Sequence, residues 1–114
     1  MALYYNLAKV YEISDDEDFA MSIVSLFVTE VPEDVMKIKE GINERDYHKA
    51  YSHAHKIKPS LDILGLDEAR LDVLQIEEWG KSEGGKKKEI IEIFKSLEGQ
   101  VEKAVKELKK DFNL

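Results

Sequence analysis

The chain has 114 residues and a hydrophobic fraction of 43%, enough to fill one core, so we expect a single domain over residues 1–114. Its 24 acidic and 17 basic residues give a net charge of −7, and such a surface repels the phosphates of nucleic acid. The absence of cysteine excludes disulfides, thiolate metal sites and cysteine nucleophiles. No apolar run approaches the roughly 20 residues of a membrane span, and the N-terminus lacks signal-peptide features. We therefore expect a cytoplasmic protein that binds neither nucleic acid nor a membrane.

Helix-forming residues dominate the chain, and capping residues divide it into helical segments. The first segment covers residues 6–11, with Asn6 placed as its cap. Ser14 and Glu17 then form the pattern of a capping box, which predicts a longer helix over residues 15–30.

Two boundaries are predicted in the middle of the chain. Pro32 suits the first turn of a new helix, because its missing N–H has no partner to lose there. Glu33 and Asp34 would then lie favourably at the positive end of that helix dipole. Asp46 is a good cap for the next helix, which extends to about Leu64.

The rest of the chain contains two more helices. Gly65 ends the preceding helix, and Asp67 caps a helix that Gly80 closes. Residues 81–85 form a loop, and the last helix covers about residues 86–111.

Apolar residues recur three and four positions apart in these segments, which predicts their buried faces. The expected inward positions are Phe19, Ile23, Leu26, Phe27, Val35, Ile38, Ile42, Tyr47, Ala50, Ala54, Ile57, Leu61, Leu64, Ala69, Val73, Leu74, Ile76, Ile90, Phe94, Leu97, Val101, Ala104 or Val105, and Leu108. Short connections between long amphipathic helices imply antiparallel neighbours. We therefore predict an all-α fold, an up-and-down antiparallel four-helix bundle with a short extra N-terminal helix. Because this core is complete, we expect a monomer.

His55 is the first candidate functional residue, because it points away from the apolar seam of its helix and toward solvent. Lys58 follows one turn later. A neutral imidazole nitrogen can attack phosphorus, and a neighbouring ammonium can balance the charge of the phosphoryl oxygens. The spacing alone also fits an ordinary exposed histidine beside an ordinary exposed lysine.

The other histidines do not form a metal-binding pattern. His53 and His55 are two residues apart on a helix, so their side chains diverge. Glu44 and His48 could supply half of a zinc site, but the break near Asp46 separates them and no third ligand is evident. We expect no metal site in this chain.

Residues 54–66, Ala-His-Lys-Ile-Lys-Pro-Ser-Leu-Asp-Ile-Leu-Gly-Leu, resemble the signature of histidine-containing phosphotransfer (Hpt) domains. That signature reads Ala-His-x-Leu-Lys-Gly, then a few small or apolar residues, then Leu-Gly. Phe27 and Pro32 match a Phe and a Pro that precede the histidine helix in this family. Ile76 and Glu77 match an apolar-acidic or apolar-Gln pair on the helix after it. The resemblance covers nearly the whole chain.

The resemblance implies roles for three side chains. His55 would take a phosphoryl group from an aspartyl phosphate on a receiver domain and pass it to another receiver, in a response regulator or a hybrid histidine kinase. Lys58 stands where the family's lysine steadies the phosphoryl oxygens. Glu77 stands where family members often hold a side chain that bonds the imidazole. By accepting a hydrogen bond from Nδ1–H it would leave Nε2 free to attack, although a solvated helix glutamate fits the pattern equally.

The sequence has no Walker-type glycine loop and no kinase motif, so we expect a phosphoryl carrier rather than an enzyme. Phosphoryl transfer depends mostly on positioning and charge neutralisation. We expect no cofactor on this chain, and Mg²⁺ on the partner receiver domain.

Pro59 departs from the family pattern, which usually has glycine at this position. Inside a helix, proline loses the hydrogen bond to the carbonyl four residues back, which here belongs to His55, and clashes with it. We therefore expect a bend that begins at His55. The bend either sets a different docking angle, which we favour because His55 and Lys58 are both retained, or marks a degenerate site in a non-catalytic docking module.

Overall fold

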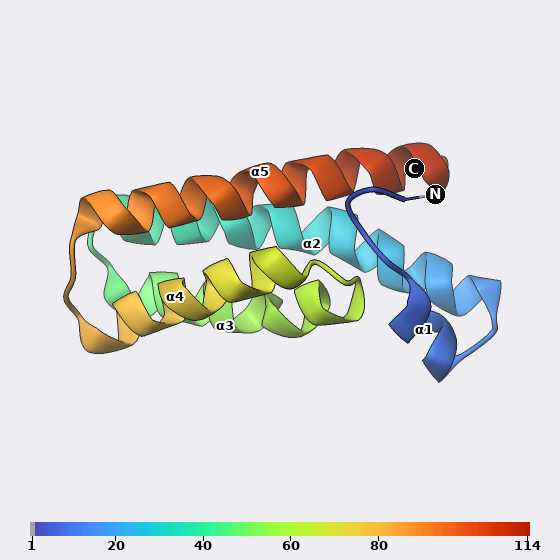
Figure 1. The fold of residues 1–114 in the computed structure, drawn as a ribbon, viewed down its shortest axis with the longest axis horizontal. Coiled ribbons are helices and arrows are strands. Elements are labelled where there is room, and N and C mark those ends of the chain that lie inside the picture. The colour runs from blue at the N-terminus through green and yellow to red at the C-terminus, as the bar shows by residue number, and fades with distance from the viewer. Residues whose placement is uncertain (1) are drawn as a thin grey trace.

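The computed structural model describes residues 2–114, which form five helices and no strands. The helices are α1 (Ala8–Ile13), α2 (Glu17–Asn43), α3 (Tyr47–Ile63), α4 (Asp67–Ser82) and α5 (Lys87–Asp111). The four long helices run up and down, and α1 lies at the end of the bundle where α2 begins (Figure 1). Helix α3 packs against α2 and α4, and α5 packs against the same two helices. These contacts confirm the predicted all-α bundle with a short N-terminal helix.

Helix α2 continues through Pro32, so the predicted boundary at that residue is wrong. The apolar stripe explains the continuity, because Phe27, Val31, Val35 and Ile38 are buried at helical spacing on both sides of the proline. Burial of this uninterrupted stripe offsets the one backbone hydrogen bond that the proline cannot make. The residues just after Pro32 therefore lie in the middle of a helix rather than at its positive end.

The beginnings of the first two helices also differ from prediction. Helix α1 begins at Ala8, whose backbone N–H donates to Asn6 Oδ1 at 2.8 Å. The predicted capping box is wrong, because Ser14 Oγ accepts a hydrogen bond from Asp16 N instead, at 3.1 Å. Asp16 is the cap of α2, and its carboxylate accepts from Asp18 N at 2.9 Å.

The boundaries of α3 follow the sequence more closely. Asp46 caps the helix by accepting from Lys49 N at 3.1 Å, as predicted. Gly65 follows the end of the helix with a φ of 72°, a left-handed conformation that glycine adopts at little cost. Asp67 is the first residue of α4 rather than its cap, and Leu66 takes the cap position without a side-chain hydrogen bond.

One apolar core extends through the bundle. Its buried members are Val10, Ala20, Val24, Phe27, Val31, Val35, Ile38, Ile42, Ala50, Ala54, Ile57, Leu61, Leu64, Leu66, Ala69, Val73, Ile76, Trp79, Ile90, Phe94, Leu97, Val101, Ala104 and Leu108. Two expected members are wrong, since Leu26 is 55% exposed and Leu74 is also exposed. Each lies one residue from a buried neighbour and is therefore rotated by about 100° away from the core. Among the helices of residues 2–114, none combines the length and apolar character needed to cross a bilayer.

The prediction that Gly80 closes α4 is wrong, because the helix continues to Ser82. A Cβ atom at Gly80 would lie 2.8 Å from the backbone oxygen of Tyr47 and 3.0 Å from the Cβ of Tyr51. The missing side chain therefore allows α4 to approach the backbone of α3 closely.

We expect Gly80→Ala to destabilise the fold by about 1–3 kcal/mol, because the added methyl would force α3 and α4 apart. Gly99→Ala is the matched control, since Gly99 is also helical but a Cβ there would meet nothing within 4 Å. The control should be more stable than wild type by about 0.5–1 kcal/mol. Urea unfolding of the three proteins measures both effects, and equal stability of the two variants would contradict the close approach.

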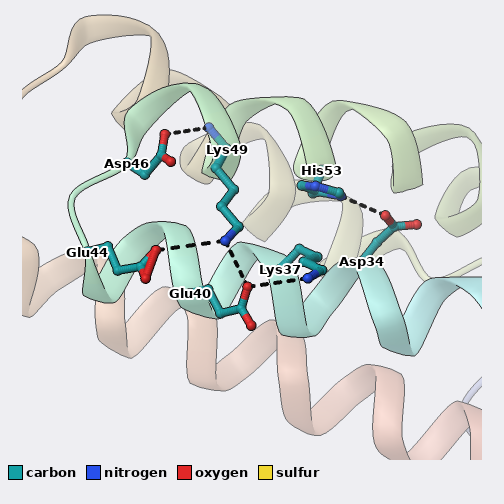
Figure 2. A network of polar contacts seen from close by, with 7 residues as sticks. All are labelled: Asp34, Lys37, Glu40, Glu44, Asp46, Lys49 and His53. Atoms are coloured by element: carbon teal, nitrogen blue, oxygen red, sulfur yellow. Dashed lines mark hydrogen bonds and ion pairs between the residues drawn. The ribbon is translucent and has the colours of Figure 1, made fainter.

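Lys49 connects the beginning of α3 to the C-terminal part of α2 (Figure 2). Its Nζ lies 2.8 Å from Glu40 Oε2 and 3.8 Å from Glu44 Oε1. The hydrogen bond from Lys49 holds the pKa of Glu40 below its ordinary value. Folding therefore favours the ionised form of this carboxylate.

The contribution of Glu40 to stability should accordingly be present above the ordinary glutamate pKa and be lost as the pH falls through the lower, folded-state pKa. We expect Glu40→Gln to be less stable than wild type at neutral pH, and the difference to vanish in acid. Urea unfolding across this pH range measures the difference. A gap that persists unchanged in acid would show that ionised Glu40 is not its source.

Candidate functional site

Helix α3 presents two polar flanks, because its apolar seam faces the core. Ala50, Ala54, Ile57 and Leu61 are buried along this seam. Side chains on either side of the seam therefore emerge toward α4 or toward α2, the two neighbours of α3. Each flank holds one histidine that contacts a carboxylate.

On the α4 flank, His55 has a side chain that is 59% exposed, as its predicted outward orientation requires. Its Nδ1 lies 2.8 Å from Oε2 of Glu77 on α4. Because an ionised carboxylate only accepts hydrogen bonds, this contact places the ring hydrogen on Nδ1. The lone pair of Nε2 is then available to a reactant.

Glu77 is nearly inaccessible, with a side chain that is 11% exposed, so the solvated alternative considered from sequence is wrong. Lys58 Nζ lies 3.1 Å from Oε1 and donates to Oε2 at 3.3 Å. The carboxylate thus contacts both the ammonium and the imidazole N–H. A buried charge requires such partners, and here they fix Lys58 and His55 to one point on α4.

Tyr51 restrains the ring of His55 from the preceding turn of α3. The two rings are nearly parallel, with an interplanar angle of 10° and centroids 5.7 Å apart, in the range of offset stacking. The imidazole is therefore held by a stacked ring as well as by its hydrogen bond to Glu77.

The opposite flank holds a second cluster that the sequence did not reveal. His53 Nδ1 lies 2.8 Å from Oδ1 of Asp34 on α2 (Figure 2). Lys56 Nζ lies 3.2 Å from Asp34 Oδ2. Asp34 was expected at a helix terminus, and its burial follows from the continuity of α2. The uninterrupted apolar stripe through Pro32 was the signal that could have placed it.

The remaining candidates lie apart from these clusters. Pro59 is exposed within α3, which continues to Ile63, so the proline does not end the helix. The expected bend stays a prediction. His48 is exposed, with Nε2 3.4 Å from Ser52 Oγ. Residues 2–114 contain no group of three or more His, Asp or Glu side chains placed to bind a metal ion together.

A sequence model of the Hpt domain matches residues 22–111, which include both clusters and most of the bundle. The chain belongs to the Hpt domain family. Hpt domains are phosphoryl carriers that act by histidine phosphotransfer in phosphorelays, and they interact with receiver domains. No curated protein and no solved structure gives a significant match to this chain.

The contact with Glu77 predicts the tautomer of His55 in the Hpt domain. We expect Nδ1–H in the wild type, because Glu77 accepts that hydrogen. Glu77→Met removes the acceptor at similar volume and should shift the ring toward Nε2–H. The ¹⁵N chemical shifts of the imidazole nitrogens measure this change. His48 serves as the internal control and should keep its shifts, whereas unchanged His55 shifts in the variant would contradict the assigned tautomer.

Proposed function

We propose that this Hpt domain accepts a phosphoryl group on Nε2 of His55 from an aspartyl phosphate of one receiver domain and passes it to the aspartate of another. The arrangement of His55 supports the proposal most directly. Its ring is exposed, yet its Nδ1 is held by the buried carboxylate of Glu77. An accessible nucleophile on a fixed element suits transfer between two folded proteins.

In the transfer step, the Nε2 lone pair attacks phosphorus as the bond from phosphorus to the aspartate oxygen breaks. The aspartate carboxylate leaves with the electron pair of that bond. The imidazole gains positive charge while its Nδ1 hydrogen remains directed at Glu77, whose negative charge balances the ring. The reverse sequence delivers the phosphoryl group to the second receiver.

Lys58 is proposed to stabilise the phosphoryl oxygens. Its ammonium is held by the same carboxylate that holds His55, which places it on the same flank of α3. An ammonium has three donors, so Lys58 can keep its contact with Glu77 and donate to a phosphoryl oxygen as well. The receiver domain supplies Mg²⁺ in this scheme, while this chain supplies the nucleophile and the ammonium.

A non-catalytic docking module with a degenerate site is the alternative, suggested by proline in place of the usual glycine at position 59. Two observations favour transfer. Helix α3 continues through Pro59, and the contacts of Glu77 with His55 and Lys58 are intact. An exposed proline ring beside the site then affects how closely a receiver approaches rather than the chemistry of the histidine.

We expect a phosphorylated receiver domain to transfer phosphate to the wild-type protein, and His55→Gln to abolish this transfer. Lys58→Met should slow it about tenfold or more, because one charged donor to the phosphoryl group is lost. His48→Gln should accept phosphate from the receiver at the wild-type rate, since His48 contacts only Ser52 among the polar side chains of the described residues. Radiolabelled phosphate and rapid quenching measure the rates.

Transfer to His55→Gln at the wild-type rate would exclude His55 as the acceptor. Receiver binding by the wild-type protein without any phosphate transfer would instead favour the docking module. Circular dichroism of each variant, compared with wild type, separates loss of transfer from loss of fold.

A further inference from the structure

The cluster on the α2 flank of α3 repeats the arrangement around His55. In both, a histidine is followed three residues later by a lysine, and both side chains contact one carboxylate on the neighbouring helix. The distance from the histidine Nδ1 to the carboxylate oxygen is 2.8 Å in each case. Asp34 and Glu77 are the only two polar residues buried in the described part of the chain. The histidine, lysine and carboxylate of the proposed site therefore each have a counterpart in the second cluster.

The ring of His53 has its hydrogen on the same nitrogen as the ring of His55. Its Nδ1 contacts the carboxylate of Asp34, which directs the ring hydrogen there. Its Nε2 makes no hydrogen bond within residues 2–114 and is not fully buried. The Nε2 lone pair is thus free and reaches solvent.

The surroundings of His53 differ from those of His55 in access. The His53 side chain is 30% exposed, about half as much as that of His55. Side chains two positions apart on a helix differ in direction by about 200°. A receiver domain docked over His55 therefore cannot reach His53. Asp34 and Lys56 also line a groove of about 270 Å³ between α2 and α3, bordered by apolar side chains such as Phe27 and Ile57. His53 does not itself line this groove, but its Nδ1 contacts Asp34, which does. An imidazole whose side chain is only 30% exposed suits a small donor better than a folded protein.

We propose that His53, with Asp34 and Lys56, is a second phosphoryl-accepting site that is used by small phosphoryl donors and is independent of His55. With phosphoramidate as donor, Nε2 of His53 attacks phosphorus, the phosphorus–nitrogen bond breaks, and ammonia leaves. The charge that develops on the ring is balanced by Asp34. Lys56, which contacts the same carboxylate, is assigned the role of donating to the incoming phosphoryl oxygens.

The experiment labels four proteins with phosphoramidate: wild type, His55→Gln, His53→Gln, and the double variant. Intact mass and phosphopeptide mapping report the number of labels and their position. We expect two labels on wild type, one label on His55→Gln that maps to His53, and none on the double variant. Transfer from a phosphorylated receiver to His53→Gln should remain at the wild-type rate, because that reaction uses His55.

Asp34→Asn tests whether the carboxylate activates His53 while the histidine itself is kept. We expect it to slow labelling of His53 by about tenfold, as removal of an orienting carboxylate does for other functional imidazoles. Labelling of His55 in the same protein should be unchanged, and circular dichroism shows whether the variant is folded. His48 is present in all five proteins as an exposed histidine that makes no contact with a carboxylate among the described residues.

Three results would overturn the proposal. His55→Gln that takes no label would show that His53 does not accept phosphate. Labelling of His48 at the same rate as His53 would show that the cluster confers no reactivity of its own. Equal labelling of His53 in Asp34→Asn and wild type would overturn the assignment of Asp34 to the site.

Discussion

Burial of a carboxylate on each side of α3 is the constraint on which the polar structure of this bundle depends. An ionised carboxylate removed from water is unfavourable unless hydrogen-bond donors and cations surround it. Side chains of α3 supply these partners to Asp34 on α2 and to Glu77 on α4. Among the described residues, Glu77 Oε1 accepts no hydrogen bond and is balanced only by its ion pair with Lys58. Helix α3 is therefore fixed to both neighbours by polar contacts of defined direction, in addition to its apolar seam.

These contacts link the packing of the helices to the chemistry of the exposed face. Apolar packing is not directional, so by itself it would leave the histidine rings free to rotate in solvent. A hydrogen bond from Nδ1 to a fixed carboxylate sets both the tautomer and the orientation of each ring. The close approach of α4 to α3 at Gly80, one turn beyond Glu77, holds the carboxylate within reach of His55. The fold thus orients an exposed imidazole through a partner that is itself buried.

The two clusters place similar side chains at different exposure. His55 lies on the more open flank, where a large partner can approach. His53 is less accessible, and it makes the same contact with a carboxylate but, within residues 2–114, lacks the stacked tyrosine that restrains His55. Exposure, rather than the identity of the contacting groups, separates the partners that each imidazole can meet.

The sequence by itself determined the number and type of the long helices after Asn43, the cap at Asp46, and the outward orientation of His55, because helical periodicity and capping are local properties. Its resemblance to the Hpt signature also singled out His55, Lys58 and Glu77. Only the tertiary structure decided that Gly80 lies within α4 and that the carboxylates of Asp34 and Glu77 are buried against α3. These features depend on the rotation and register of packed helices relative to one another, and local propensity does not determine either. For the same reason the pairing of His53 with Asp34 appeared only once the helices were packed together.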